Sequence, residues 1–375
     1  MRDTLKFITW PALAGLFAAL LILDRFISPG APGGDEPVAP DSVSYAAAVR
    51  SASPAVVNIY TARLVPERTR QIQDMFSRRL DPPKEQRQRI EQSLGSGVIM
   101  TEQGHILTNN HVINEVDAIQ VLLHDGRLAK ARVIGTDTAT DLAVLKIDLP
   151  DLQPVELGNS DDTRVGDVVL AIGNPLGFGN SVTQGIVSAL GRYFPQQGRA
   201  NTYEDYIQTD AIIHLGNSGG ALVDTQGRLL GINTLIYTAG DQGRAASPTG
   251  IGISLAIPVN LAVFVMQDLV DYGEVIRGWL GVSVEPVRRL FNGSPTGQAL
   301  VVEAISEDSP AQRAGVQLGD IITHIDGETI RDGRQTMHRI AMLRPGDDID
   351  VTVLRDKQSL DLHAIVGTLR QSPTI

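Results

Sequence analysis

The stretch "TDAIIHLGNSGGALVD", residues 209–224, places a single serine inside a glycine-rich turn. Ser218 lies between Gly216 and the pair Gly219–Gly220. Glycines let backbone N–H groups turn inward without a Cβ clash, as a pocket for a negatively charged oxygen requires. The stretch therefore predicts either an ordinary turn or a reactive serine, whose oxyanion pocket would use the N–H groups of Gly216, Asn217 and Ser218.

The pattern Gly216-x-Ser218-x-Gly220 also matches the nucleophile elbow of α/β-hydrolases. In those enzymes the acid and then the histidine follow the serine in the chain, and strands alternate with helices. Here the only histidines after Ser218 are His324, His338 and His363, all near the C-terminus. Since the chain around the serine also lacks alternating helical patterns, the α/β-hydrolase interpretation is excluded.

His111 is the better candidate for the base. The segment "ILTNNHVI" delivers it at the end of a β-type run, where a strand end can hold an imidazole rigidly. His214 is nearer in sequence, but it shares the tight turn with Ser218 and cannot easily reach both the serine and an acid. We expect His214 at the rim of the pocket or packed beneath the loop.

Asp141 is the candidate acid, because "TATDLAVLKI" places it directly ahead of a strong strand. Asp137, in the preceding turn, and Asp210, which we expect to brace the serine loop, are the rival carboxylates. A neutral imidazole removes the serine proton, and a buried carboxylate fixes the imidazole tautomer. The order His111, Asp141, Ser218 is that of chymotrypsin-type enzymes, which are double β-barrels, so we predict a serine endopeptidase.

Composition limits the partners and cofactors that the chain could use. Hydrophobic residues make up 42% of the 375, enough for real cores, and the net charge of −11 makes a nucleic-acid partner unexpected. Cysteine is absent, and neither HExxH nor GxxxxGK[ST] occurs. We therefore predict no metal and no cofactor.

The N-terminus resembles a membrane anchor. Residues 7–23 form 17 uncharged, mostly apolar residues that follow Arg2 and Lys6. A spanning helix needs about 20 residues, with a range of about 17–25. We predict an uncleaved transmembrane helix, with a cleaved signal peptide as the alternative. Either reading exports the rest of the chain, which in a bacterium means the periplasm.

The chain divides into four parts by composition and pattern. Many short β-type runs separated by turns predict a mainly β first domain, closed by a helix that starts at Val259 and stops at a glycine. The expected parts are a cytoplasmic tip and anchor (1–27), a flexible Pro/Gly linker (28–42), a trypsin-like protease domain (43–273) and a smaller C-terminal domain (277–371).

The motifs "TNNHVI", "TDLAVLKID", "AIGNPLGFGNSVTQGIVSA", "IQTDAIIHLGNSGGALVD" and "GISLAIP" occur in an order that resembles the HtrA family of serine proteases. With its anchor the chain is most similar to the DegS/AlgW branch. The resemblance implies a double β-barrel protease with one PDZ domain, assembled as a homotrimer, and Tyr45 is a candidate trimer contact. It also implies a single-pass inner-membrane protein that cleaves the periplasmic part of a membrane anti-sigma factor.

The PDZ resemblance implies a ligand as well. "WLGV", residues Trp279, Leu280, Gly281 and Val282, has the form of a loop whose N–H groups receive a peptide carboxylate. The expected ligands are C-terminal peptides of misfolded outer-membrane proteins, and Arg199 is the expected relay from the PDZ domain to the protease.

This sequence departs from the family at His214–Leu215, where Asn-Pro is common, and at Ser254–Leu255, where an aromatic residue is frequent. These positions affect the resting state of the loop and the pocket for the substrate's P1 residue. Asn233, Thr234 and Leu235 are expected to line that pocket, which would suit a small or medium apolar side chain. Two other functions stay open: a general periplasmic quality-control protease, and a non-catalytic PDZ chaperone or scaffold.

Overall fold

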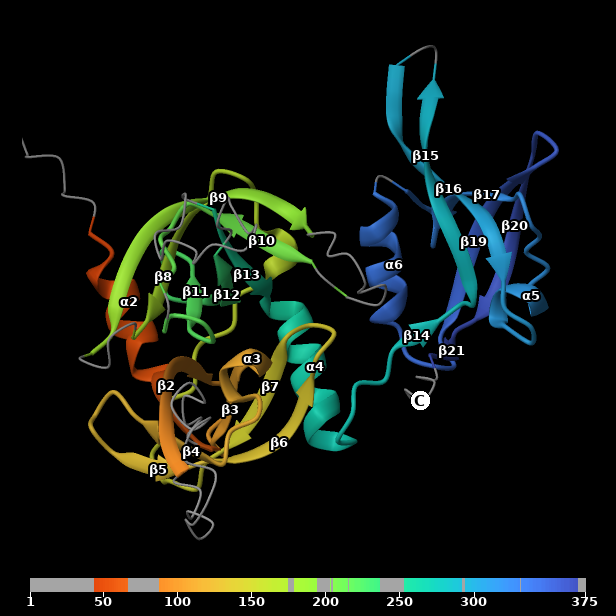
Figure 1. Cartoon of the computed structure of the whole chain (residues 1–375). Coiled ribbons are helices and arrows are strands. Elements are labelled where there is room, and N and C mark those ends of the chain that lie inside the picture. The colour runs from red at the N-terminus through yellow and green to blue at the C-terminus, as the bar shows by residue number, and fades with distance from the viewer. Residues whose placement is uncertain are drawn as a thin grey trace, which may run out of the picture. The chain divides into compact units, whose positions relative to one another are not determined.

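The computed structural model describes residues 44–66, 88–174, 179–193, 203, 205–214, 216–236, 253–291, 294–330 and 332–369. These residues form two β-barrels and a smaller β domain, which confirms the expected mainly β class (Figure 1). None of the helices in these ranges has the length and apolar character that a bilayer crossing needs. The expected anchor, residues 7–23, lies outside the described residues.

The first barrel is a seven-stranded antiparallel sheet in the order β5-β4-β1-β2-β3-β7-β6. Its strands are β1 (Val56–Pro66), β2 (Gln88–Ile99), β3 (His105–Asn109), β4 (Ala118–Leu122), β5 (Leu128–Lys130), β6 (Arg132–Asp137) and β7 (Leu142–Lys146). Only Ala131 separates the edge strands β5 and β6, so the two edges of the sheet lie next to each other and the sheet is rolled up. Three short helices accompany it: α2 (Ala46–Ala52), η1 (Ser53–Ala55) and α3 (Asn110–Ile113).

The second barrel is closed, in the order β10-β13-β12-β11-β8-β9. Its strands are β8 (Val168–Gly173), β9 (Ser181–Arg192), β10 (Tyr206–Thr209), β11 (Ala221–Val223), β12 (Leu229–Ile236) and β13 (Ser254–Pro258), preceded by the one-turn η2 (Ser160–Asp162). Its interior is apolar and buried, as the short runs in the sequence predicted. Closure leaves no free sheet edge at the serine loop, which enters β11.

The helix expected at Val259 is α4 (Val259–Asp271). It follows Pro258 directly, and Gly273 beyond its end has a φ of +79°, the left-handed conformation that ends many helices. Val265 and Leu269 are fully buried and belong to the core that the first barrel shares with part of the second. The helix packs on β6, β7 and β12, so it holds strands of both barrels.

The C-terminal domain has its own apolar core. A sheet in the order β15-β16-β17-β19-β20 is built from β15 (Val282–Phe291), β16 (Ser294–Ile305), β17 (Ile321–Ile325), β19 (Asp348–Arg355) and β20 (Gln358–Ile365), with β18 (Glu328–Thr329) paired to β17. A small ladder joins β14 (Gly278–Trp279) to β21 (Gly367–Thr368), and α5 (Pro310–Arg313) and α6 (Gly333–Ala341) complete the domain. β15 is an edge strand, so one side of it is open to a partner strand.

Candidate active site

His111 and Asp141 lie side by side at one end of the first barrel. β3 ends at Asn109, and the single turn α3 that follows carries His111, which confirms its place at a strand end. The Nδ1 atom of His111 is 2.6 Å from Oδ2 of Asp141, and the backbone N–H of His111 donates to Oδ1 at 3.0 Å. One carboxylate thus holds both the ring and the backbone of His111.

Asp141 reaches this position through an unusual backbone conformation. Its φ is +58°, a left-handed value that is uncommon for a residue other than glycine. The carbonyl of Asp141 accepts hydrogen bonds from the Asn110 N–H at 3.0 Å and from Nδ2 of Asn109 at 3.1 Å. These bonds fix the turn at the start of β7 against the end of β3, so carboxylate and imidazole are held by adjacent strands.

The rival carboxylates are engaged elsewhere. Asp137 is buried and accepts hydrogen bonds from Thr140 and Arg277. Asp210 accepts the Ile186 N–H at 2.7 Å, which ties the segment before the serine to β9, as the bracing role predicted. Among these three aspartates, only Asp141 contacts His111.

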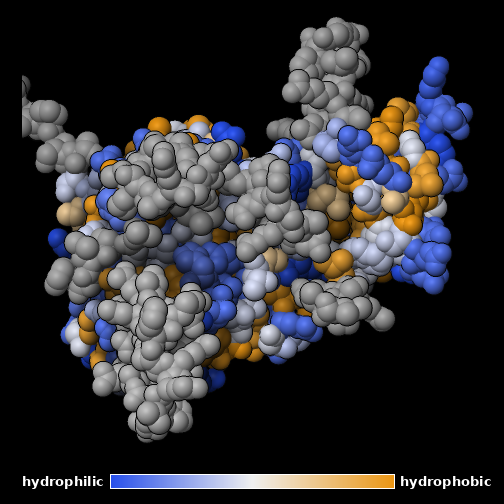
Figure 2. Space-filling model, viewed as in Figure 1, coloured by the Kyte–Doolittle hydropathy of each residue, from blue (hydrophilic) through white to orange (hydrophobic). Residues whose placement is uncertain are grey.

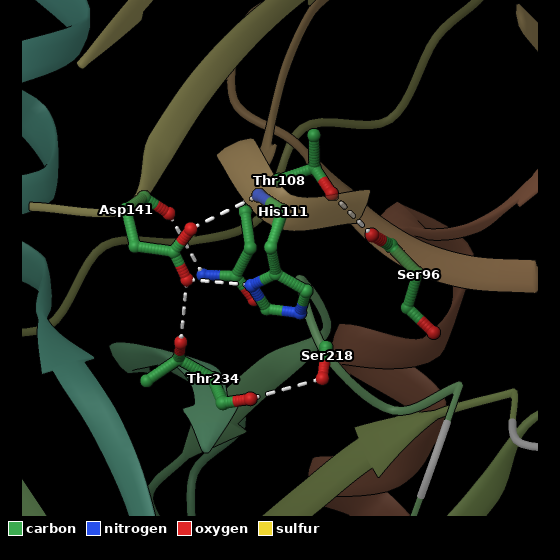
Figure 3. A network of polar contacts seen from close by, with 7 residues as sticks. Ser96, Thr108, His111, Asp141, Ser218 and Thr234 are labelled. Atoms are coloured by element: carbon green, nitrogen blue, oxygen red, sulfur yellow. Dashed lines mark hydrogen bonds and ion pairs between the residues drawn. The ribbon is translucent and has the colours of Figure 1, made fainter. Parts of the chain in front are cut away.

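Ser218 comes from the second barrel and faces the same point. The His111 ring lies between Asp141 and Ser218 (Figure 3). Within the described chain, the Ser218 hydroxyl donates its one hydrogen bond to the carbonyl of Thr234 on β12, at 2.9 Å, and not to His111. The hydroxyl of Thr234 donates to Oδ2 of Asp141 at 3.1 Å. Thr234 therefore touches both the acid and the serine, a link that the sequence analysis missed when it placed this residue only in the pocket wall.

The serine turn leaves two backbone donors free. The Asn217 N–H donates to the carbonyl of His214 at 2.9 Å, and Gly216 has a φ of +95°, a positive value that glycine adopts readily. Neither the Gly216 N–H nor the Ser218 N–H donates a hydrogen bond to any described residue. The pocket therefore has two available donors, and the Asn217 N–H, expected as a third, is occupied by the turn itself. His214 is exposed, in keeping with a place at the rim.

Ser96 on β2 joins the two barrels at this turn. It is fully buried, its N–H donates to the Ser218 carbonyl at 2.9 Å, and its hydroxyl donates to the Gly216 carbonyl at 2.7 Å. A Cβ on Gly219 would lie 2.1 Å from the Ser96 carbonyl oxygen, so only glycine allows this approach. The flanking residues Gly95 and Gly97 were a sequence signal for Ser96 that the sequence analysis did not use.

The expected P1-pocket residues are only partly described. Asn233 is fully buried, and its Nδ2 donates to the Ala221 carbonyl at 2.9 Å, so this side chain braces β11. The Leu235 side chain lies outside the described residues, as does the whole of Arg199. Ser254 is buried and accepts the Ile213 N–H at 3.2 Å, so it supports the segment leading to Ser218.

The "WLGV" loop of the C-terminal domain is fixed by its own backbone. The carbonyls of Leu280 and Gly281 accept N–H groups from Ala311 and Ser306 at 2.9 and 2.8 Å. Gly281 has a φ of +79°, and a Cβ there would lie 2.3 Å from Cβ of Ser309. The loop leads directly into the open edge strand β15.

Over the same described ranges, no three side chains of His, Asp or Glu come together as a metal site would require.

Comparison with known proteins agrees with this architecture. Residues 95–232 match the family model of the trypsin-like peptidase domain, and residues 278–366 match that of the PDZ domain. The chain is 42% identical over 328 residues to the serine endoprotease DegS of Escherichia coli strain K12, covering 86% of this chain and 85% of DegS. It is 43% identical over 346 residues to a probable periplasmic serine endoprotease, DegP-like, of Pseudomonas savastanoi pv. phaseolicola, covering 86% and 70%.

Solved structures are similar over comparable lengths. The HtrA-type protease AlgW with a decapeptide has a TM-score of 0.66 and 46% identity, covering 88% of this chain and 100% of that one. The serine endoprotease from Yersinia pestis has a TM-score of 0.56 and 40% identity, covering 87% and 98%.

Proposed function

Because the chain belongs to the HtrA family of serine endoproteases, we propose that it is the membrane-anchored, signal-sensing type, with His111, Asp141 and Ser218 as its catalytic triad. The observation that carries the triad is the meeting of the His111–Asp141 pair, at 2.6 Å, with a serine from the other barrel beside two free N–H groups. Serine endoprotease activity follows from membership of the family. The assignment of the catalytic roles to these three residues is what we propose.

In the proposed mechanism, Ser218 first turns from the Thr234 carbonyl toward His111. The imidazole accepts the hydroxyl proton as the serine oxygen bonds to the substrate's carbonyl carbon, and the Gly216 and Ser218 N–H groups stabilise the resulting oxyanion. His111 then gives the proton to the leaving amine, and the peptide bond breaks. Water, deprotonated by His111, then bonds to the acyl carbon; the bond to the Ser218 oxygen breaks as His111 returns the proton to that oxygen, and Asp141 stabilises the imidazolium in both steps.

We assign activation to the PDZ domain. The rigid "WLGV" loop and the open edge of β15 suit a peptide that ends in a free carboxylate and pairs as an added strand. The expected ligands are C-termini of misfolded outer-membrane proteins, and the expected substrate is the periplasmic part of a membrane anti-sigma factor. With residues 7–23 as the anchor, the protease and PDZ domains would lie in the periplasm.

Trimer formation is supported by an apolar face on β9. Val182, Ile186 and Leu190 share one side of this strand and are 37%, 41% and 40% exposed. Hydrophobic colour lies along the upper edge of the first domain in Figure 2, over β9. Gln184, between them, donates to the Tyr45 hydroxyl at 3.5 Å. An exposed apolar stripe of this kind is typical of a subunit contact.

The trimer is tested by sedimentation. Ile186→Glu places a charge in this face and should release monomers, whereas Leu128→Glu, on the exposed part of β5, should leave the assembly intact. Monomeric wild-type protein at micromolar concentration would contradict the trimer.

The function is tested with the full chain in detergent and candidate membrane anti-sigma factors. We expect one or two cuts, faster with a peptide that has a free C-terminal carboxylate than with the same peptide amidated, and none with Ser218→Ala. Broad digestion of an unfolded protein irrespective of peptide would favour the quality-control alternative, which the DegP-like relatives make the second candidate. Absence of labelling by a fluorophosphonate, even with peptide, would favour a scaffold.

A further inference from the structure

The turn that carries Asp141 is tied to a residue far along the chain. Asp137 closes β6 opposite Leu142 of β7, so residues 138–141 form the loop of a hairpin. Inside this loop the Thr140 hydroxyl donates to Oδ2 of Asp137 at 2.5 Å. Nη2 of Arg277 donates to the same oxygen at 2.5 Å. Thr140 directly precedes Asp141 in the chain. Asp137 therefore links Arg277 to the neighbour of Asp141 through two hydrogen bonds.

This ion pair is deeply buried. The side chains of Arg277 and Asp137 are 5% and 7% exposed. The Arg277 guanidinium also lies over the ring of Tyr203, 4.5 Å from its centre, and the Tyr203 N–H donates to the carbonyl of Ala139 at 3.2 Å. The loop before Asp141 is therefore held from two sides, by an arginine and by the tyrosine on which that arginine rests. A planar guanidinium suits this arrangement because it can pair and stack together.

The backbone of Arg277 is fixed as well. Its carbonyl accepts the Leu369 N–H at 3.1 Å, next to the β14–β21 ladder of the PDZ domain. The preceding N–H, of Ile276, donates to the fully buried carboxylate of Asp268 on α4 at 2.8 Å. Arg277 is thus anchored where the protease domain ends and the PDZ domain begins.

Asp141 needs such support. Its left-handed φ of +58° is a conformation that surrounding contacts must impose, and its carboxylate must remain directed at His111. We infer that Arg277 is a positioning residue for the catalytic acid: through Asp137 it fixes the loop that presents Asp141 to His111. The inference rests on the proposed role of Asp141, and it assigns to the buried Asp137, a rival acid in sequence, a supporting task.

The test measures the rate at which a fluorophosphonate labels Ser218 in the full chain between pH 5 and 9. Arg277→Met should slow labelling about tenfold, since small misplacements in an active site are costly. It should also move the acid-side midpoint of the pH profile to lower pH, because a carboxylate that faces the imidazole less well stabilises its cation less. Arg277→Lys, which keeps the charge without the planar group, should fall between.

Two comparisons separate positioning from folding. Arg355→Met removes the arginine of another ion pair, inside the PDZ domain, in which Asp320 is buried and the Arg355 side chain is 24% exposed. It should leave rate and midpoint within about twofold. The double variant Asp137→Asn with Arg277→Met leaves no uncompensated buried charge, so it should recover thermal stability but not the labelling rate.

Each other result overturns the inference. Wild-type rate and midpoint in Arg277→Met would show that the loop does not need the arginine. Recovery of the wild-type rate in the double variant would show that only stability was lost. An equal shift in Arg355→Met would show a general effect of weakening the chain. If His111→Ala is inactive while Arg277→Met is normal, the triad stands and only this inference fails; if wild type is never labelled, with or without C-terminal peptide, both fail.

Discussion

In the first barrel, His111 and Asp141 are already in contact with each other. In the second barrel, Ser218 donates its hydrogen bond to a carbonyl of the same barrel. His111 and Asp141 are 2.6 Å apart and are supported by the ends of β3 and β7. Ser218 donates to Thr234 on β12 instead of to His111. The acid–base half is thus assembled in this structure, and the nucleophile half needs a side-chain rotation. This rotation of one hydroxyl is the change that the proposed mechanism requires of Ser218.

The largest effect should come from removing the nucleophile. Ser218→Ala should lower peptide hydrolysis by roughly 10⁶-fold, and His111→Ala by a similar factor, because the two act as one unit although they belong to different barrels. Hydrolysis rates with and without a PDZ peptide provide the measurement. Substantial residual activity in either variant would contradict the proposal that Ser218 and His111 act together.

Asp141→Asn should cost about 10⁴-fold while leaving the fold intact, because an amide favours the wrong imidazole tautomer. Steady-state rates and a melting curve would be compared with those of Asp210→Asn, whose carboxylate holds Ile186 instead of a histidine. Equal losses of activity in the two variants would contradict the choice of Asp141 as the acid.

Ser96→Ala tests the support of the nucleophile half. The substitution removes the hydroxyl that donates to the Gly216 carbonyl and accepts the Asn174 N–H. We expect a loss of about 10²-fold, comparable to the loss of an oxyanion donor. Stability should fall by about 2 kcal/mol, because a buried acceptor loses its partner. Fluorophosphonate labelling together with urea unfolding measures both, and Ser93→Ala, on the exposed part of β2, is the control.

Thr234→Val tests the support of the acid half. It deletes the hydroxyl that donates to Asp141 but keeps the carbonyl that accepts from Ser218. A hydrogen bond to a charged group contributes about 1.5 kcal/mol, so the rate should fall roughly tenfold. Thr234→Ser, which keeps the donor, should be near normal. A larger loss of rate in Thr234→Val than in Ser96→Ala would show that support of Asp141 matters more than support of the serine turn.

The smallest expected effect is on the pH dependence of stability, through two histidines of the PDZ domain. Hydrogen bonds to Asp350 and Asp348 raise the pKa of His363, so its stabilisation is present below about pH 6.5 and is lost as the pH rises through the folded-state value. Burial lowers the pKa of His338, so its protonation opposes folding at acid pH.

His363→Gln should therefore lower the melting temperature by roughly 1–3 °C at pH 5.5, and by progressively less as the pH rises through the folded-state pKa. His338→Gln should lose less at pH 5.5 than at pH 8, and calorimetry of the full chain can compare the two. If the loss of melting temperature changed with pH in the same direction in both variants, the opposite pKa shifts of these side chains would be contradicted.

The positions of the proposed catalytic groups could be predicted from the sequence, because these groups occur in recognisable local settings. A strand end before His111, a strand start after Asp141 and a glycine turn around Ser218 each reveal a candidate. The helix from Val259 to its glycine stop was equally readable.

What the sequence did not predict is contact between distant segments. Arg277 lies in unremarkable surroundings, and the glycines that flank Ser96 do not reveal its partners. The proposed roles of both residues depend on which buried partner the fold brings to them. The orientation of Ser218 and the occupied N–H of Asn217 are set by single torsions and hydrogen bonds, which no spacing of residue types encodes.

The division of the site between two barrels also governs when the chain can act. Synthesis proceeds from the N-terminus, so β1–β7, with the proposed base and acid, emerge before Ser218 has been made. After Ser218 has been made, Ser96 of the first barrel adds two hydrogen bonds that hold the serine turn. If the proposed triad is right, a nascent chain that has not yet reached Ser218 lacks the nucleophile and cannot cleave a peptide bond.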